Sequence, residues 1–296
     1  MFVVCFGDGL GNQMFQYAFY KALKHHYPEN DVLMDIFRIY GKHIHNGFEL
    51  GLVFGIKSNE VQYEKALRLA DYWPDTSIKN KFFNKLHGLR RYLCGPKKSY
   101  ITQDDPTGFY ESVFELPDTQ SFIFKGNWVN EKYFSCVKDE IISDFRFPVL
   151  TEENNLKYAE LIKNSTSVSV HIRKGDYINS QMLNLTIDYY KKAKIELENR
   201  ISKPQYFIFT DDFDAVEEYI ELFPGAILIE NNTGEKSFRD MQMMSLCDHN
   251  IIANSTFSFW GAYLNLNEQK VVIGPSKAKY DFKNPFACED WIVLEV

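Results

Sequence analysis

The chain has 296 residues, which suits two medium-sized domains or one large one. Its 45% hydrophobic and 25% charged residues are typical of an ordinary globular protein. A formal net charge of −7 argues against a general nucleic-acid-binding protein, because such a protein needs a basic face to neutralise phosphates.

In the N-terminal half, a short apolar strand at residues 3–6 is followed by a glycine-rich turn at 7–11. The next segment, NQMFQYAFYKALKHH, predicts a helix whose apolar residues share one face. Further strands are predicted at 31–36 and 121–128. Between residues 57 and 118 the weak periodicity predicts only helices and loops.

The C-terminal half alternates strands and helices more regularly. Strands are predicted at residues 168–172, 206–210, 226–230, 251–253 and 271–274, and helices at 188–199, 238–247 and 259–266. Such alternation predicts an α/β fold with mainly parallel sheets that helices cover on both faces. We place the domain boundary in the polar stretch 148–165, which gives domains 1–155 and 156–296.

The cysteines and the N-terminus favour a cytoplasmic protein. The five cysteines are odd in number and lack CxxC spacing, which is typical of reduced thiols. The opening residues, MFVVCFGDGLGNQ, lack the basic region of a signal peptide, and no run of about 18 apolar residues predicts a membrane-spanning helix. Peripheral attachment to the inner face of the membrane stays open.

Polar clusters follow four of the predicted strands: GDGLGN, RKGD, TDD and NST. Ligands of open parallel sheets bind beyond the carboxyl ends of the strands, so these clusters mark the expected site. The glycines of the first cluster allow a ligand to approach the backbone, and a helix N-terminus favours anions. A plain strand-to-helix turn with Asn12 as the N-cap explains that cluster equally well.

The RKGD cluster suits phosphate binding. Arg173 can grip a phosphate bidentately, and Lys174 adds a point charge. Asp176 could orient Arg173 or accept a proton. The alternative is a surface ion pair, because charged turns are common.

The acidic cluster Asp211, Asp212 and Asp214 has two interpretations. It resembles the DxD of metal-dependent sugar-nucleotide enzymes, but acidic residues after a strand more often cap a helix. We favour capping and expect no metal, because an arginine can neutralise a diphosphate. His171 and His249 lack partners at metal spacing and are expected to be hydrogen-bonded core residues.

In the fourth cluster, Asn254, Ser255 and Thr256 precede a predicted helix. Their polar groups could donate to phosphate or cap the helix, and the two roles are compatible. Phe257 follows them as either a lining or a core residue.

Four segments together resemble the bacterial α-1,2-fucosyltransferase family: GLGNQMFQYAFYKAL, SVHIRKGDY, FIFTDD and CDHNIIANSTFSFWGAYLN. They occur in the family's order and span residues 7–267. The family is related to the protein O-fucosyltransferases and the α-1,6-fucosyltransferases. The resemblance implies a GT-B-like fold of two facing Rossmann-like domains, and GDP-fucose as a donor used without metal or cofactor.

The resemblance also implies roles for residues of this chain. Arg173 is expected to contact the donor diphosphate, and Asn12 to reach the same phosphates from the first glycine turn. The other expected donor-binding residues are Gly11, His171, Asp211, Asp212, Asn254, Ser255, Thr256 and Phe257.

This chain departs from the family pattern twice. The family often has two consecutive arginines where this chain has Arg173 and Lys174. Its first motif commonly reads GGLGNQ, whereas Asp8 replaces a glycine here, either as a turn residue or facing the acceptor.

The implied reaction is an inverting transfer of L-fucose from GDP-β-L-fucose to the 2-hydroxyl of a terminal galactoside in a glycan. Arg173 and Asn12 would counter the charge that grows on the β-phosphate, and Asp8 and Asp176 are the candidate bases. The C-terminal domain would hold the donor and the N-terminal domain the acceptor. Alternatives are a metal-dependent transferase using Asp212 and Asp214, and a non-catalytic glycan- or nucleotide-binding protein.

Overall fold

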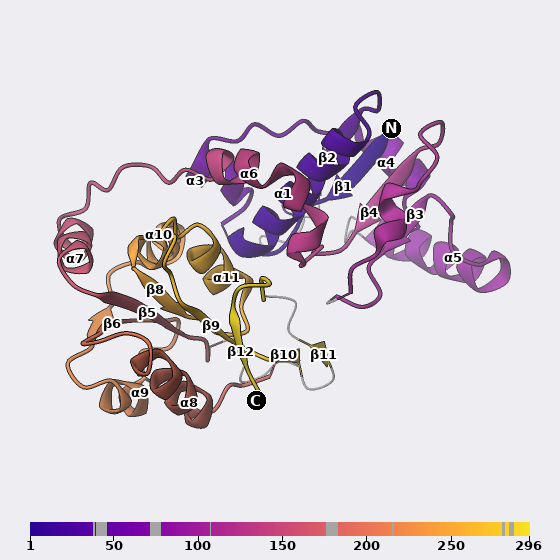
Figure 1. Cartoon of the computed structure of the whole chain (residues 1–296). Helices are drawn as coiled ribbons and strands as arrows, with labels where there is room; N and C mark the ends of the chain where they lie inside the picture. The colour runs from indigo at the N-terminus through magenta and orange to yellow at the C-terminus, as the bar shows by residue number, and fades with distance from the viewer. Residues whose placement is uncertain are drawn as a thin grey trace. The chain divides into compact units, whose positions relative to one another are not determined.

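The structure is a computed structural model that describes residues 1–37, 39, 46–71, 78–106, 108–175, 183–214, 216–279, 282–283 and 287–296. The chain divides into two compact units, Met1–Arg146 and Phe147–Val296. Figure 1 shows the elements of both units in chain order. Within the described ranges, no helix is long and apolar enough to cross a bilayer.

The first unit is built on a parallel four-stranded sheet. In spatial order its strands are β2 (Val32–Asp35), β1 (Phe2–Cys5), β4 (Phe122–Lys125) and β3 (Tyr100–Thr102). Its helices are α1 (Leu10–His26), α3 (Glu49–Phe54), α4 (Tyr63–Leu69), α5 (Ile78–Cys94) and α6 (Lys138–Asp144). Short 3₁₀ turns occur at Glu111–Phe114, Glu131–Tyr133 and Ser135–Val137.

Aromatic packing holds α1 against one face of this sheet. Phe19 stacks on Trp128 with ring centroids 4.3 Å apart and meets Phe124 of β4 edge-on at 5.5 Å. The opposite face of β1 packs Val3 against α4. Because strand side chains alternate between faces, β1 is buried on both sides, as its continuous apolar sequence predicts.

The second unit contains a six-stranded parallel sheet. In spatial order its strands are β12 (Ile292–Leu294), β9 (Val272–Pro275), β8 (His249–Ile251), β5 (Ser167–Ile172), β6 (Gln205–Thr210) and β7 (Ile227–Ile229). Its helices are α7 (Glu153–Lys163), α8 (Ile187–Glu198), α9 (Glu217–Leu222), α10 (Phe238–Leu246) and α11 (Thr256–Tyr263), with a 3₁₀ turn at Gly234–Lys236. A short antiparallel pair, β10 (Lys277–Lys279) and β11 (Phe282–Lys283), completes it.

Helices cover both faces of the second sheet. Helices α8 and α9 pack on the face that carries Val168 and Val170, and α7 and α10 pack on the face that carries Phe207 and Phe209 (Figure 1). Helix α11 approaches α10 closely: a Cβ added to Gly261 would lie 2.8 Å from the Met244 Cβ, so this crossing requires glycine. The α/β class with two mainly parallel sheets is therefore confirmed.

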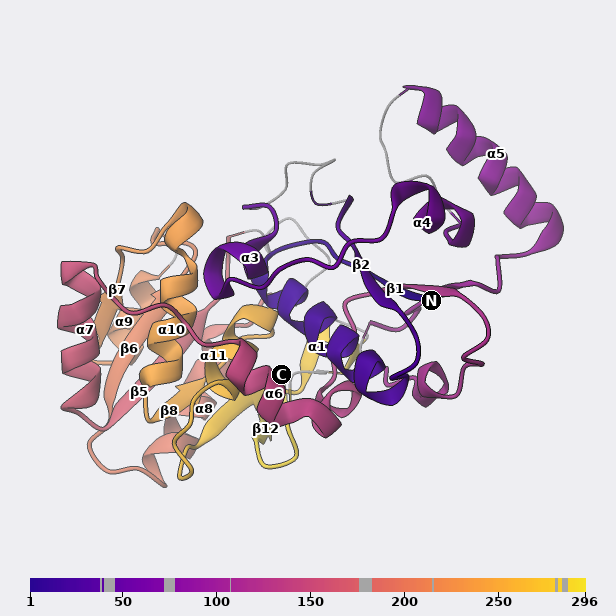
Figure 2. The same cartoon turned by 90° about the horizontal axis from the view of Figure 1, so that it is seen from above.

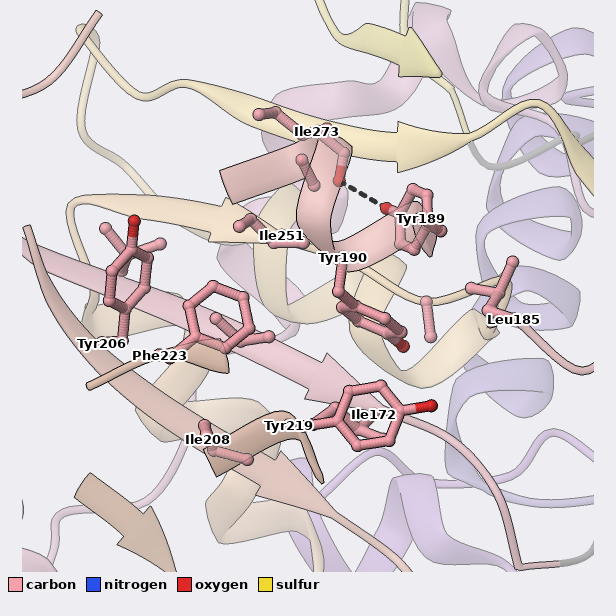
Figure 3. Close-up of a cluster of buried hydrophobic side chains, with 14 of the residues drawn as sticks. Ile172, Leu185, Tyr189, Tyr190, Tyr206, Ile208, Tyr219, Phe223, Ile251 and Ile273 are labelled. Carbon is pink, nitrogen blue, oxygen red and sulfur yellow. Dashed lines mark hydrogen bonds between the residues drawn. The ribbon is translucent and has the colours of Figure 1, made fainter. Parts of the chain in front are cut away.

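Tyrosines of α8 fix the carboxyl ends of three strands of this sheet. The Tyr190 hydroxyl donates to the His171 carbonyl at 3.0 Å. The Tyr189 hydroxyl lies 2.6 Å from the Ile252 carbonyl and 3.3 Å from that of Ile273. Figure 3 shows the contact with Ile273. Both hydroxyls are buried, so these bonds give each of them a partner inside the protein. They also hold in place the edge from which the next loops leave.

The region between residues 57 and 118 holds more regular structure than its periodicity predicts. It contains the strand β3, which the sequence analysis missed, and the 17-residue helix α5. Strand β3 is only three residues long and half-buried, so it carries little apolar signal.

Candidate functional site

The carboxyl ends of β5, β6 and β8 bring the predicted polar clusters of the second unit to one edge. Strand β5 pairs with β6 up to the partners Ile172 and Thr210, and with β8 on its other side. The residues that follow these strands are Arg173, Asp211 and the segment 254–257. Parallel pairing therefore places three of the four clusters side by side, as the sequence analysis expects.

Asp211 holds the turn that carries Arg173. Its Oδ2 lies 3.1 Å from the Arg173 Nε, and its Oδ1 accepts a 3.0 Å hydrogen bond from the Lys174 backbone N–H. A Cβ added to Gly175 would lie 2.8 Å from the same Oδ2, so the glycine leaves room for the carboxylate. One aspartate thus fixes both the backbone and the guanidinium of this turn.

The Arg173–Asp211 pair is only partly exposed, with 26% and 23% of the two side chains accessible. Asp211 belongs to the expected donor-binding set, and Asp176 is the residue predicted from the sequence to orient Arg173. Asp211 makes that contact in the structure. Asp176 lies outside the described residues, so its role as an orienting group or base stays a prediction.

Lys174 directs its ammonium group into the protein. The Nζ donates to the Leu185 carbonyl at 3.0 Å and lies 5.3 Å from the centre of the Tyr219 ring. Burial lowers the Lys174 pKa, although Glu218 and Asp212 oppose that shift. This bond uses one of the three ammonium hydrogens, and the expectation that Lys174 adds a point charge to a phosphate stays a prediction.

His171 is buried beside Arg173. Burial lowers its pKa well below the usual value, and the positive charge of Arg173 lowers it further, so the imidazole is neutral at physiological pH. Its ring lies 5.9 Å from that of Phe257. Among the described residues, its Nδ1 has no hydrogen-bond partner, and donor contact by His171 stays a prediction. His249, expected in the core, accepts from the Val271 N–H at 3.0 Å.

The segment 254–257 caps α11, as predicted. Ser255 is the N-cap, and its side chain accepts from the Phe257 N–H at 3.3 Å. The Asn254 amide donates both of its hydrogens, to the carbonyls of Leu183 and Ala278 at 2.8 Å each. The Asn254 amide nitrogen therefore has no hydrogen left for a phosphate, and it supports the segments next to the site. Thr256 and Phe257 are partly exposed there.

The aspartates after Asp211 form a local turn. The Asp212 N–H donates to the Thr210 hydroxyl at 3.1 Å, and the Asp214 N–H donates to the Asp212 Oδ1 at 3.2 Å. Across the described parts of the chain, no group of three or more His, Cys, Asp or Glu side chains could hold a metal ion. The next helix, α9, has Val216 as its N-cap and no side-chain cap, so none of these aspartates caps it and the capping interpretation is wrong. The expectation that the site binds no metal stays a prediction.

The glycine-rich turn of the first unit lies between β1 and α1. Its N-cap is Gly9, without a side-chain cap, and Asn12 lies inside the first turn of α1, so the N-cap assignment to Asn12 is wrong. Gly11 is buried next to it. Asp8 is exposed and adopts a positive φ of 62°, a conformation that favours glycine. This explains why a glycine commonly stands at that position.

Two buried glutamines, which the sequence analysis did not identify as important, hold this turn. Gln16 accepts from the Gly7 N–H at 3.0 Å, and Gln13 donates to the Asp8 carbonyl at 2.9 Å. Their spacing of three residues at the start of an apolar helix is the signal that could have identified them. Phosphate contact by Asn12 stays a prediction.

The chain belongs to glycosyl transferase family 11, whose profile matches residues 97–295. It is 29% identical to the O-antigen biosynthesis glycosyltransferase WbnK of Escherichia coli, over 98% of this chain and 99% of that protein. It is 32% identical to the alpha-1,2-colitosyltransferase of Escherichia coli, over 90% of this chain and 89% of that protein. The resemblance carried by the four motifs is therefore confirmed.

Two further likenesses are more distant or more local. Galactoside 2-alpha-L-fucosyltransferase Sec1 of Mus musculus is 30% identical over 34% of this chain and 29% of its own length. The crystal structure of the fucosyltransferase NodZ from Bradyrhizobium superposes with a TM-score of 0.46 and 13% identity, covering 88% of this chain and 91% of that one.

Proposed function

We propose that this protein transfers L-fucose from GDP-β-L-fucose to the 2-hydroxyl of a terminal galactoside in a glycan, with inversion at the anomeric carbon. Family membership and the names of the relatives support this assignment. The observation that carries it is Arg173, which stands at the end of β5 and is held by Asp211. A guanidinium fixed at this edge suits the diphosphate of a nucleotide sugar.

Arg173 acts on the leaving group. As the bond between the anomeric carbon and the β-phosphate oxygen breaks, negative charge grows on GDP, and a preorganised cation stabilises it. Asp211 keeps the guanidinium in place, so little reorganisation is needed when the charge develops. The acceptor oxygen forms the new bond and gives its proton to a carboxylate, for which Asp8 is the candidate among the described residues.

The proposal requires no divalent cation, because Arg173 supplies the counter-charge. Transfer should therefore persist in excess EDTA. Loss of activity in EDTA, with recovery on adding Mn²⁺, would favour the metal-dependent alternative that uses Asp212 and Asp214.

Colitosyl transfer is a second candidate, because the relative that is 32% identical over 90% of this chain is an alpha-1,2-colitosyltransferase. Colitose is L-fucose without its 3-hydroxyl. Competition between the two GDP-sugars for one acceptor measures the preference directly. A higher kcat/KM for the colitosyl donor would replace fucose in the proposal.

The experiment that tests the proposal is an acceptor screen with GDP-fucose, with products detected by mass spectrometry and linkages assigned by NMR. We expect an α-1,2-linked fucose on a terminal galactoside. Transfer to another hydroxyl would refute the regiochemistry. If the protein neither transfers fucose nor slowly hydrolyses the donor, that result would favour the non-catalytic alternative.

A further inference from the structure

Helix α5 of the first unit exposes a stripe of large apolar side chains. Phe82, Leu86, Leu89 and Leu93 follow one another at intervals of four, three and four residues, which places them on one face of the helix. They are 62%, 46%, 56% and 70% exposed, and the neighbouring Tyr92 is 86% exposed. Figures 1 and 2 both show α5 at the outer end of its unit, beyond α4.

A different flank of α5 and the residues after it attach the helix to its unit. The Arg90 Nη2 lies 2.8 Å from the Oδ1 of Asp71, whose carboxylate is fully buried. After the helix, the Lys97 Nζ donates to the carbonyls of Ala70 at 2.7 Å and Arg68 at 3.0 Å. These polar contacts hold α5 in place while the leucines of the stripe keep about half or more of their surface in water.

The charge around this stripe is positive throughout. Residues 76–103 contain seven lysines and arginines and no aspartate or glutamate, in a chain whose net charge is −7. Lys85, Arg91 and Lys98 are exposed there. Lys85 lies three residues after Phe82 and four before Leu89, which places it at the margin of the stripe. The excess negative charge of the chain is therefore confined to other segments.

Exposed leucines together with basic residues on one helix suit an anionic membrane surface as the partner. A helix with an apolar stripe flanked by lysine and arginine binds in the plane of an anionic bilayer surface, with its apolar side chains at the boundary of the acyl chains. Lysine stems can extend from that depth so that the ammonium groups meet lipid phosphates. A second copy of α5 fits less well, because pairing two such helices would bring like charges together.

We propose that α5 docks this protein onto an anionic phospholipid surface, with Leu86, Leu89 and Leu93 inserted and Lys85 near the headgroups. The helix lies on the membrane and does not span it. This inference does not depend on which sugar the enzyme transfers, because α5 belongs to the first unit and Arg173 belongs to the second.

Sedimentation with vesicles tests the proposal on the full chain. We expect binding to vesicles of phosphatidylcholine with phosphatidylglycerol, weak binding to pure phosphatidylcholine vesicles, and a steep loss of binding as salt is raised. The double variant Leu86→Ser/Leu89→Ser should lower the partition coefficient at least about tenfold. The matched control Leu161→Ser/Ile195→Ser, which changes two similarly exposed residues of the second unit, should bind like the parent.

The charge contribution has its own pair of variants. Lys85→Glu should reduce binding to the anionic vesicles at least about fivefold at low salt, since each cation near such a surface contributes roughly a fivefold factor. Lys65→Glu makes the same change of charge at an exposed position of the same unit and should have little effect.

Three results would overturn the proposal. The first is equal binding to anionic and neutral vesicles, and the second is that the α5 variants bind like the parent. The third is a parent protein that does not bind vesicles but sediments as a dimer, with Leu86→Ser/Leu89→Ser becoming monomeric. That outcome would assign the stripe to contact between copies of this chain.

Discussion

Replacing Arg173 by alanine separates a phosphate-binding role from a purely structural one. The Arg173–Asp211 ion pair joins partly exposed side chains 3.1 Å apart, so its loss should lower the free energy of unfolding by at most about 1 kcal/mol. For a chain of this length that change lowers Tm by roughly 2–4 °C. In contrast, removing one preorganised donor from a developing anion typically lowers kcat by about 100- to 1000-fold.

The assay is steady-state kinetics with GDP-fucose and an accepted galactoside, paired with thermal melts of each variant. Arg173→Lys should recover only part of the rate, because an ammonium group cannot reproduce the planar guanidinium. Arg200→Ala is the matched control: it removes an arginine whose Nη2 lies 2.6 Å from Glu196 on α8, and it should leave kcat unchanged. If Arg173→Ala melts normally and keeps more than about a tenth of the parent rate, a difference of only ~1.4 kcal/mol, then Arg173 does not act on the leaving group.

Three other substitutions, at Gly175, Asp8 and Asp240, give further tests. Gly175→Ala places a Cβ 2.8 Å from the Asp211 Oδ2, so kcat should fall roughly ten- to hundredfold with little change in Tm; an unchanged kcat would contradict the positioning role of Asp211. Asp8→Gly relieves a φ of 62° and should stabilise the fold by up to about 1 kcal/mol, while kcat falls at least about 100-fold if Asp8 is the base; a preserved kcat makes it a turn residue only. Burial raises the Asp240 pKa to about 7 against an opposing hydrogen bond from Asn232. The folded state therefore retains a proton that the unfolded state loses near pH 4. The free energy of unfolding should fall by about 1.4 kcal/mol per pH unit from pH 4 to 7. Urea titrations at several pH values should show that Asp240→Asn loses this dependence.

Both parallel sheets could be predicted because strands that are buried on both faces appear in the sequence as short, continuous apolar runs. Ser167–Ile172 and Gln205–Thr210 match their predicted ranges to within one residue. Helix α5 could not be predicted from burial, because its apolar stripe faces outward and basic residues interrupt the pattern. Strand β3 gave too short a signal to recognise.

The position of the site could also be predicted, whereas the pairing of its side chains could not. Parallel strands deliver their carboxyl ends to one edge, so HIRKG and FTDD had to lie together. Which carboxylate meets Arg173 depends on the register between β5 and β6, and the sequence does not contain that register. The same limit applies to Lys174, whose partner Leu185 belongs to a segment that reaches it only through the fold.

The register of β5 and β6 accounts for the partnership of Arg173 and Asp211. Ile172 pairs with Thr210, so the next residue of each chain leaves the sheet at the same level, and these residues are Arg173 and Asp211. An aspartate at position 210 would point into the sheet. Asp212, one position after Asp211, belongs to the turn in which its N–H donates to the Thr210 hydroxyl. The first aspartate of FTDD is therefore the one that can meet both the Arg173 Nε and the Lys174 N–H. The segments HIRKG and FTDD, which look like separate ligand-binding clusters in the sequence, together hold a single guanidinium at the edge of the sheet.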